Sequence, residues 1–293
     1  MEFDHALKVV CAATVGTALF VSACIRLFST ARRQRQVAVF CNAVCQDGDY
    51  VSLFIHPRWG LSPSISPSCT AVETFLRLAK IPYKAYVSCE DSLASSPLLP
   101  CIVYRGQCVA GTVSIIQHLM GVFQIEMDDE LNGVQHAIGI ALRSMLVCGS
   151  RFALRHTLSH QALIHTVPHA MSSLDASLTS VMHFFSWLKV DILSVGKLRR
   201  LNLLEDQYEN SYMRDLEAVE ALIGNKPYLF GSEPTSYDCV VYAMLLPIMR
   251  LREAIFVNEP FAFAAQSSVL RGYVQRMSGA AFNDLEQLCC NKS

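Results

Sequence analysis

Charged residues are scarce in this chain, and neither sign is in excess. Asp, Glu, Lys and Arg make up 17% of the 293 residues, with 24 basic against 25 acidic side chains and a net charge of −1. A chain without a basic surplus has no bulk attraction for the phosphates of nucleic acids, and no stretch interleaves basic with aromatic residues. The composition therefore argues against nucleic acid as a partner.

The sequence also lacks the grouped ligands of a metal site. Cys41 and Cys45 form one Cys-x₃-Cys pair without a second pair nearby, whereas a structural zinc site needs four ligands. A row of histidines at positions 156, 160, 165 and 169 is interrupted by Pro168 and joined by no Cys or carboxylate. The twelve cysteines are scattered, several of them in apolar runs, which indicates reduced core residues. We therefore expect no metal and no disulfide framework.

No charge at all occurs between Val9 and Ile25, and basic residues follow from Arg26 onward. A helix that spans a bilayer needs roughly 17 to 25 apolar residues, so this run predicts a single-pass membrane anchor. A signal peptide or a surface helix is an alternative, but the acidic Glu2 and Asp4 precede the run where a signal peptide would be basic. The basic flank places the folded part in the cytosol, at an intracellular membrane that the sequence does not name.

The remainder is rich in hydrophobic residues, which are 52% of the chain and can bury two packed units. The pattern from residue 50 to 121 predicts a strand, a helix, a second strand, a hairpin and a further helix, which is the order of a thioredoxin-like domain. Its first helix follows Ser66 and stops at Ile81-Pro82, and the hairpin turns at Arg105-Gly106. A polar stretch from 89 to 97 is expected to be a connection.

The second half has helical periodicity throughout. We expect long helices over residues 128–156 and 205–223, the latter ended by Gly224, and a buried helix from Cys239 to about Leu251. Thr235 and Asp238 have the spacing of a reciprocal cap at the start of that buried helix, so we assign Asp238 to folding. Pro247 lies inside the same helix and predicts a kink.

These motifs resemble a known family. The first half is similar to glutathione transferases, and Ser66-Pro67-Ser68-Cys69 followed by Glu73-Thr74-Phe75-Leu76-Arg77 resembles the branch of failed-axon-connections proteins and metaxins. The runs 226–231 and 233–238 match the C-terminal domain of that branch. The resemblance implies an α/β thioredoxin-like domain at 50–121 and an all-α glutathione-transferase domain at 122–280. Before them we place the anchor at 1–36 and a linker at 37–49, and after them a tail at 281–293.

The resemblance also implies where glutathione would bind. In glutathione transferases a Tyr, Ser or Cys near the start of the first helix stabilises the thiolate. Ser66 falls at the first position of a Cys-x-x-Cys motif and Cys69 at the second, so no dithiol cycle is available. Ser66 is therefore the candidate thiolate donor, with a helix cap as its alternative role, and Cys69 is a weaker candidate.

Two further pairs complete the implied glutathione site. Pro100 resembles the cis-proline of the fold, and Leu99 before it would present its backbone to the cysteinyl part of glutathione. Gly111 and Thr112 stand where the third helix begins and where the family holds the γ-glutamyl group. Gly111 departs from the usual acidic residue or Gln, whereas Thr112 keeps a hydroxyl. The family's side-chain contact to the γ-glutamyl group is therefore absent at Gly111, whereas the hydroxyl is present at Thr112.

Three functions follow from these features. The first is a membrane-anchored glutathione-transferase-like protein that binds glutathione or small electrophiles in detoxification or stress response. The second is a non-catalytic, metaxin-like adaptor that contacts protein partners, or a second copy of itself, at an organelle membrane. The third is a redox- or metal-responsive protein that uses its cysteines. The missing side chain at Gly111 favours the adaptor.

Overall fold

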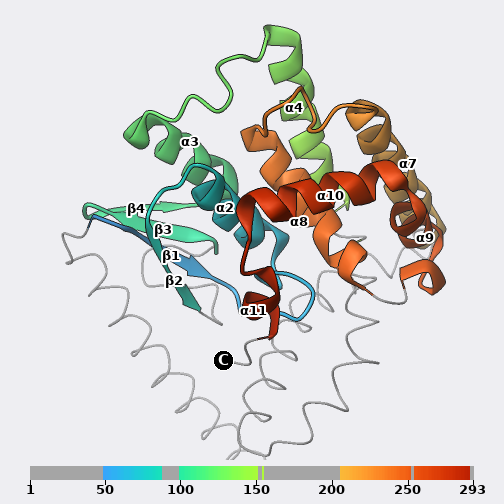
Figure 1. Cartoon of the computed structure of the whole chain (residues 1–293), viewed down its shortest axis with the longest axis horizontal. Helices are drawn as coiled ribbons and strands as arrows, with labels where there is room; N and C mark the ends of the chain where they lie inside the picture. The colour runs from blue at the N-terminus through green and yellow to red at the C-terminus, as the bar shows by residue number, and fades with distance from the viewer. Residues whose placement is uncertain (1–48, 88–98, 151–153, 155–204, 252–253, 291–293) are drawn as a thin grey trace, which may run out of the picture.

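The computed structural model describes residues 49–87, 99–150, 154, 205–251 and 254–290, which form a small sheet domain packed against a helical domain (Figure 1). The predicted anchor at 9–25, the Cys41/Cys45 pair, the connection at 89–97 and the histidine row lie outside these residues. Within the described ranges, none of the helices combines the length and the apolarity needed to cross a bilayer, and no group of three or more His, Cys, Asp or Glu could hold a metal.

The first domain is a four-stranded mixed sheet covered by two helices. Its strands are β1 (Val51–Ile55), β2 (Tyr83–Val87), β3 (Cys101–Tyr104) and β4 (Gln107–Ala110), in the spatial order β2-β1-β3-β4. β1 runs parallel to β2 and antiparallel to β3, with Leu53 opposite Ile102. Helices α2 (Pro67–Leu78) and α3 (Thr112–Phe123) pack on this sheet. The predicted thioredoxin-like order is confirmed.

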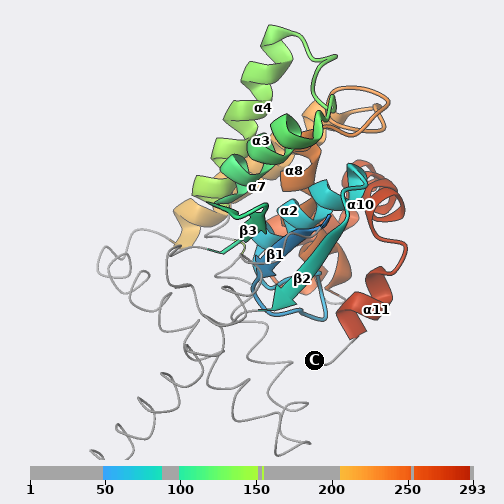
Figure 2. The ribbon, with the colours of Figure 1, turned by 90° about the vertical axis from the view of Figure 1, so that its left-hand side faces the viewer.

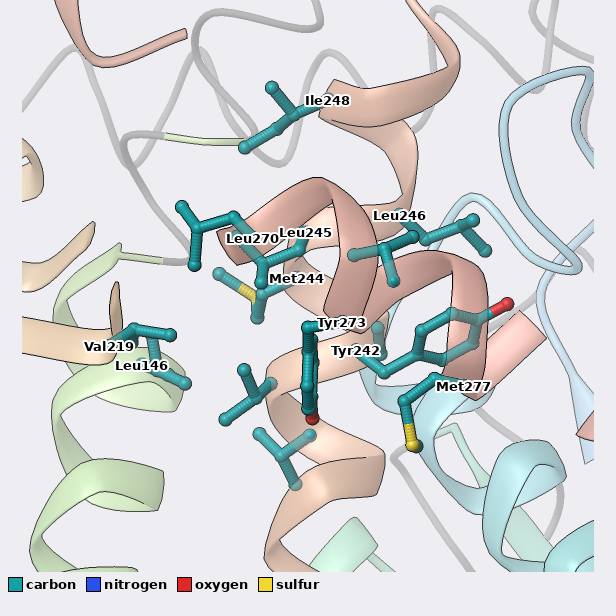
Figure 3. Close-up of a cluster of buried hydrophobic side chains, with 14 of the residues drawn as sticks. Leu146, Val219, Tyr242, Met244, Leu245, Leu246, Ile248, Leu270, Tyr273 and Met277 are labelled. Carbon is teal, nitrogen blue, oxygen red and sulfur yellow. The ribbon is translucent and has the colours of Figure 1, made fainter. Parts of the chain in front are cut away.

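The second domain is helical and is built around α8 (Ser236–Arg250). Every α8 residue from Ser236 to Ile248 is buried, Asp238 is the one charged residue among them, and the helix continues past Pro247. The other elements among the described residues of this domain are α4 (Gly133–Met145), the π-helical turn η1 (Leu146–Ser150), α7 (Glu205–Ile223), the 3₁₀ turn η2 (Ala254–Phe256), α9 (Glu259–Gln266), α10 (Ser268–Ala281) and α11 (Leu285–Cys290). Figure 3 shows α8 side chains such as Tyr242 and Leu245 beside Leu270, Tyr273 and Met277 of α10.

The structure corrects one predicted element and adds another. The helix expected from residue 128 begins only at Gly133, because the Asn132 side chain accepts from the N–H groups of Val134 and Gln135, at 3.0 and 2.9 Å. It then gives way to η1 after Met145. In the segment 281–293, predicted as a tail, the structure places α11.

The reciprocal cap of α8 is confirmed. The Asp238 carboxylate accepts from Thr235 N at 2.8 Å and from the Thr235 hydroxyl at 2.6 Å. It also accepts from Leu229 N at 3.0 Å and from the Tyr273 hydroxyl at 3.0 Å. Burial raises the pKa of Asp238, while these hydrogen bonds oppose the rise. A second cap was not predicted: Asp128, distant in sequence, accepts from Ser236 N at 2.8 Å.

The two domains share an apolar interface between α2 and α8. Helix α2 lies between the sheet and α8 (Figure 1, Figure 2). Ala71 of α2 belongs to the core of the helical domain, and Cys239 of α8 belongs to the core of the sheet domain. Each domain therefore completes the other's core at this interface.

Candidate functional site

Ser66 begins α2 in the position of an N-cap, but its side chain does not cap the helix. Its backbone is extended, with φ −96° and ψ 118°, and Pro67 follows at the first helical position. The Ser66 carbonyl accepts from Cys69 N and Thr70 N, at 3.0 and 3.1 Å. Its hydroxyl instead lies near the Cys69 thiol, where it opposes the rise in the pKa of that thiol. The Ser66 side chain is half-buried.

Cys69 lies in the core of the sheet domain. Its side chain is 0% exposed, and this burial raises the pKa of the thiol to about 11. A thiol with that pKa is protonated at neutral pH, and only the thiolate is a good nucleophile. The weaker catalytic candidate is therefore a core residue of α2.

The Leu99–Pro100 peptide bond is cis, as the resemblance implied. Leu99 is buried, and the Pro100 carbonyl accepts from Gly111 N at 3.0 Å. This bond joins the loop before β3 to the start of α3. The two predicted backbone contacts for glutathione, at Leu99-Pro100 and at Gly111-Thr112, are thus held next to each other.

Gly111 is required by backbone conformation rather than by space. It is the N-cap of α3 with φ 86° and ψ 136°, and a Cβ built there would meet nothing within 4 Å. No side chain caps α3, and no acidic residue lies in its first turn. The first N–H groups of a helix lack intrahelical partners, so this end suits a carboxylate. Thr112, half-buried, is the first helical residue there.

The first turns of α2 and α3 meet at a cavity between the domains, which we call the interdomain cavity. Its volume is about 10 Å³, room for about one water molecule. The lining residues come from α2, α3, η1 and α8: Pro67, Ser68, Ala71, Thr112, Val147, Val240 and Met244. The structure therefore brings Thr112 and the residues that follow Ser66 to one place, where apolar side chains fill the remaining space.

A buried charged group lies further along α2, and sequence reasoning missed its role. Glu73 is 0% exposed, and its carboxylate accepts from Arg58 Nη2 at 2.9 Å and from the Tyr83 hydroxyl at 2.8 Å. Arg58 Nη1 donates to the second carboxylate oxygen and to the Pro63 carbonyl. A buried carboxylate with two donors is satisfied, so this arrangement is structural.

Arg77 extends this group to the end of the chain. Its Nε donates to the Tyr83 hydroxyl at 2.7 Å, and its two Nη atoms donate to Asp284 at 2.5 and 3.1 Å. Its guanidinium also lies 4.6 Å from the centre of the Phe282 ring. The Arg77 guanidinium holds the pKa of Asp284 below its usual range. We call Arg58, Glu73, Arg77, Tyr83 and Asp284 the charge network. The i,i+4 spacing of Glu73 and Arg77 was its only signal in the sequence.

Family models match both domains. The model described as "Glutathione S-transferase N-terminal domain" matches residues 67–163, and that described as "Glutathione S-transferase, C-terminal domain" matches residues 212–277. Failed axon connections of Drosophila melanogaster is 24% identical over 263 residues, an alignment that covers 82% of this chain. The chain spans about 60% of the length of that curated relative.

Solved structures share the fold at low identity. Glutaredoxin 2 of Salmonella typhimurium, solved in complex with glutathione, has a TM-score of 0.53 and 12% identity, covering 83% of this chain and 100% of that one. Glutathione transferase GSTFuA2 of Phanerochaete chrysosporium has a TM-score of 0.53 and 13% identity, covering 80% and 99%. These values establish a common architecture of a thioredoxin-like domain followed by a helical domain.

Proposed function

Because the chain belongs to the glutathione-transferase-like family, in the branch that contains Failed axon connections, we propose that it works without transferase chemistry, as an adaptor that binds other proteins. The observation that supports this proposal is the interdomain cavity. Its volume is about 10 Å³. Small-molecule sites usually measure roughly 300 Å³ or more. As the described residues line it, the interdomain cavity is too small to hold glutathione or an electrophile.

The candidate site residues at the starts of α2 and α3 support the same proposal. The Cys69 thiol is 0% exposed, and this burial raises its pKa, so it is a poor nucleophile at neutral pH. Gly111 supplies no side chain where the family usually carries an acidic residue or Gln. A transferase needs a group that stabilises the glutathione thiolate more strongly than water does. Among the described residues here, Ser66, Ser68 and Thr112 carry hydroxyls, and none of them is paired with an acidic residue in the first turn of α2 or α3.

Glutathione binding without conjugation is the second candidate. It is favoured by the cis Leu99–Pro100 bond and by the hydrogen bond from Gly111 N to the Pro100 carbonyl, which hold the two backbone contact points together. The N-terminal end of α3 also offers N–H groups without intrahelical partners, which can bind a carboxylate. In this case the ligand would require the interdomain cavity to open.

Calorimetric titration of glutathione into the full chain separates the two candidates. The variants are Ser66→Ala and the control Ser114→Ala, which removes an exposed hydroxyl in α3 outside the interdomain cavity. The adaptor proposal expects no heat up to millimolar glutathione, and no conjugation of a chloronitrobenzene. The adaptor proposal would be contradicted if the wild type bound glutathione with a free energy of roughly −8 to −4 kcal/mol, and if Ser66→Ala weakened this binding while Ser114→Ala left it unchanged. Heat that neither variant changes would favour binding through the backbone of Leu99 and Gly111.

Partner binding is tested directly. The tagged chain is isolated from cells with its bound proteins, before and after glutathione depletion, and the isolated chain is sized by light scattering. The adaptor proposal expects a defined set of partners that is unchanged by glutathione. If the tagged chain is isolated only with further copies of itself, as a homodimer, the proposal changes to self-association. If the partners are lost when glutathione is depleted, the adaptor proposal is contradicted.

We further propose that residues 9–25 anchor the chain in an intracellular membrane, with both domains in the cytosol. The support is the uncharged run and the basic residues after it. Extraction at alkaline pH should leave the full chain in the membrane pellet and release a variant lacking residues 9–25. Protease added to intact organelles should digest both domains. Release of the full chain, or protection of the domains, would overturn this proposal.

A further inference from the structure

Two cysteines face each other on the β3–β4 hairpin. Cys101 begins β3 and Cys108 lies in β4, and their sulfur atoms are 3.3 Å apart. In the hairpin register Cys101 is opposite Ala110 and Val103 is opposite Cys108, so the two cysteines are diagonal neighbours on the same face of the sheet. The turn between the strands has positive φ at Arg105 and Gly106, which holds that register.

The two thiols differ in exposure and in acidity. Cys101 is 0% exposed, whereas Cys108 is exposed. The other cysteines whose side chains the structure describes, Cys69, Cys239 and Cys289, are all buried. The hydrogen bond with Cys101 lowers the pKa of Cys108 to about 7, whereas burial raises the pKa of Cys69 to about 11. A larger share of Cys108 than of an ordinary cysteine is therefore thiolate at neutral pH, and the thiolate is the form that reacts with oxidants.

We propose that Cys101 and Cys108 form a reversible disulfide when the chain meets a peroxide. The Cys108 thiolate attacks one peroxide oxygen, becomes a sulfenic acid and releases the second oxygen as hydroxide, which takes up a proton to give water. The Cys101 sulfur then attacks the Cys108 sulfur, loses its proton and displaces the hydroxyl as a second water. Overall two thiols lose two protons and two electrons, and hydrogen peroxide is reduced to two waters.

The hairpin can accommodate this bond. Among the strands that the structure describes, β4 has four residues, lies at the edge of the sheet and pairs with β3 alone, so these strands restrain its backbone on one side. A disulfide has its sulfurs about 2.05 Å apart, so they must approach each other by about 1.3 Å. Rotation of the exposed Cys108 side chain and a small shift of the edge strand supply this movement.

The bond would join the two segments that carry the candidate glutathione contacts. Cys101 directly follows the cis-Pro100, and Cys108 lies three residues before Gly111. Oxidation would therefore tie these segments together through side chains, in addition to the hydrogen bond from Gly111 N to the Pro100 carbonyl. This oxidation site does not depend on the proposed adaptor function.

The experiment treats the full chain with a small excess of hydrogen peroxide, blocks remaining thiols with an alkylating agent and maps cross-linked peptides by mass spectrometry. We expect a peptide pair joined through Cys101 and Cys108, which disappears after reduction with dithiothreitol. Cys108→Ser removes an exposed thiol, so it should leave the fold intact and abolish the cross-link. Cys289→Ala is the matched control, which removes a cysteine outside the hairpin and should leave the cross-link unchanged.

A further variant checks the order of the two steps. In Cys101→Ala the resolving thiol is absent, so Cys108 should accumulate as a sulfenic acid that dimedone labels. Should Cys101→Ala fail to fold, labelling the wild-type chain in the first seconds of peroxide exposure tests the same step. A Cys108 that stays reduced while another thiol oxidises would overturn the proposal. So would a dominant cross-link from Cys108 to any cysteine other than Cys101.

Discussion

Glu73 is the residue on which the charge network depends. Glu73→Gln keeps the shape of the side chain but removes the charge that balances Arg58, which is 13% exposed. Leaving one member of a buried ion pair unpaired costs about 3 kcal/mol or more. We therefore expect Glu73→Gln to lower the free energy of unfolding by about 3 kcal/mol, measured from the urea midpoint.

The control for this residue is an ion pair at the surface. Glu286 pairs with Arg250, but its side chain is 75% exposed. Solvent screens such pairs, so Glu286→Gln should leave the urea midpoint almost unchanged. Equal effects of the two substitutions would mean that the charge network contributes no more than a surface pair.

Two glycines of α3 should respond to alanine in opposite directions. Gly111 at the N-cap has φ 86°, which an L-residue rarely adopts, so Gly111→Ala should destabilise the protein by about 1–2 kcal/mol. Gly121 lies exposed inside the same helix, where a Cβ meets nothing within 4 Å. Because alanine favours a helix interior, Gly121→Ala should stabilise by about 0.5–1 kcal/mol. Thermal unfolding of both variants measures these two changes in stability. A Gly111→Ala variant more stable than the wild type would contradict the argument that an L-residue is strained at this N-cap.

The stability of the protein should depend on pH through Asp284, which lies directly before α11. Arg77 holds the pKa of Asp284 below its usual range, so the folded state favours the carboxylate. The resulting stability is fully present above the usual Asp pKa of about 3.9 and is lost as pH falls through the lower folded value. Asp284→Asn should therefore be less stable than the wild type at pH 7.

The difference in stability between wild type and Asp284→Asn should shrink as the pH falls below about 3.9. Because Asp284 is 40% exposed, the difference at pH 7 should stay below about 1 kcal/mol. Denaturant midpoints of both proteins at pH 7, 5 and 3 measure it. A gap that stays constant over this range would rule out the Arg77 pair as its cause.

The whole molecule should unfold as one unit, because each domain contributes to the other's core. Ala71 of α2 is 2% exposed in the core of the helical domain, and Cys239 of α8 is 0% exposed in the core of the sheet domain. Separating α2 from α8 would open both cores to water. We expect a single peak in calorimetric unfolding of the wild type.

Ala71→Asp would place an unpaired charge in this interface. The cost of burying it is several kcal/mol, so the variant should separate the unfolding of the two domains into two peaks. Ala79→Asp, at the end of α2 and only half-buried, is the matched control and should keep one peak. Two peaks in the wild type would contradict the shared core.

The features that sequence alone determined are those set by short-range chemistry. The cap formed by Thr235 and Asp238, the helix 205–223 and the hairpin at Arg105-Gly106 each depend on residues within a few positions of one another. The order of strands and helices followed from periodicity, which reports the buried face of each element. The cis bond before Pro100 came from family resemblance.

Only the tertiary structure decided what depends on contacts between distant segments. Asp128 caps a helix that begins 108 residues later, and Arg77 meets Asp284 across 207 residues. The same holds for the interdomain cavity, whose volume depends on how α2, α3, η1 and α8 pack together. The pattern of one segment carries no information about which side chain will fill the space beside it, because packing is set jointly by all the neighbours. Sequence therefore identified Ser66 and Thr112 as hydroxyls at two helix starts, and packing decided that the cavity beside Thr112 is small.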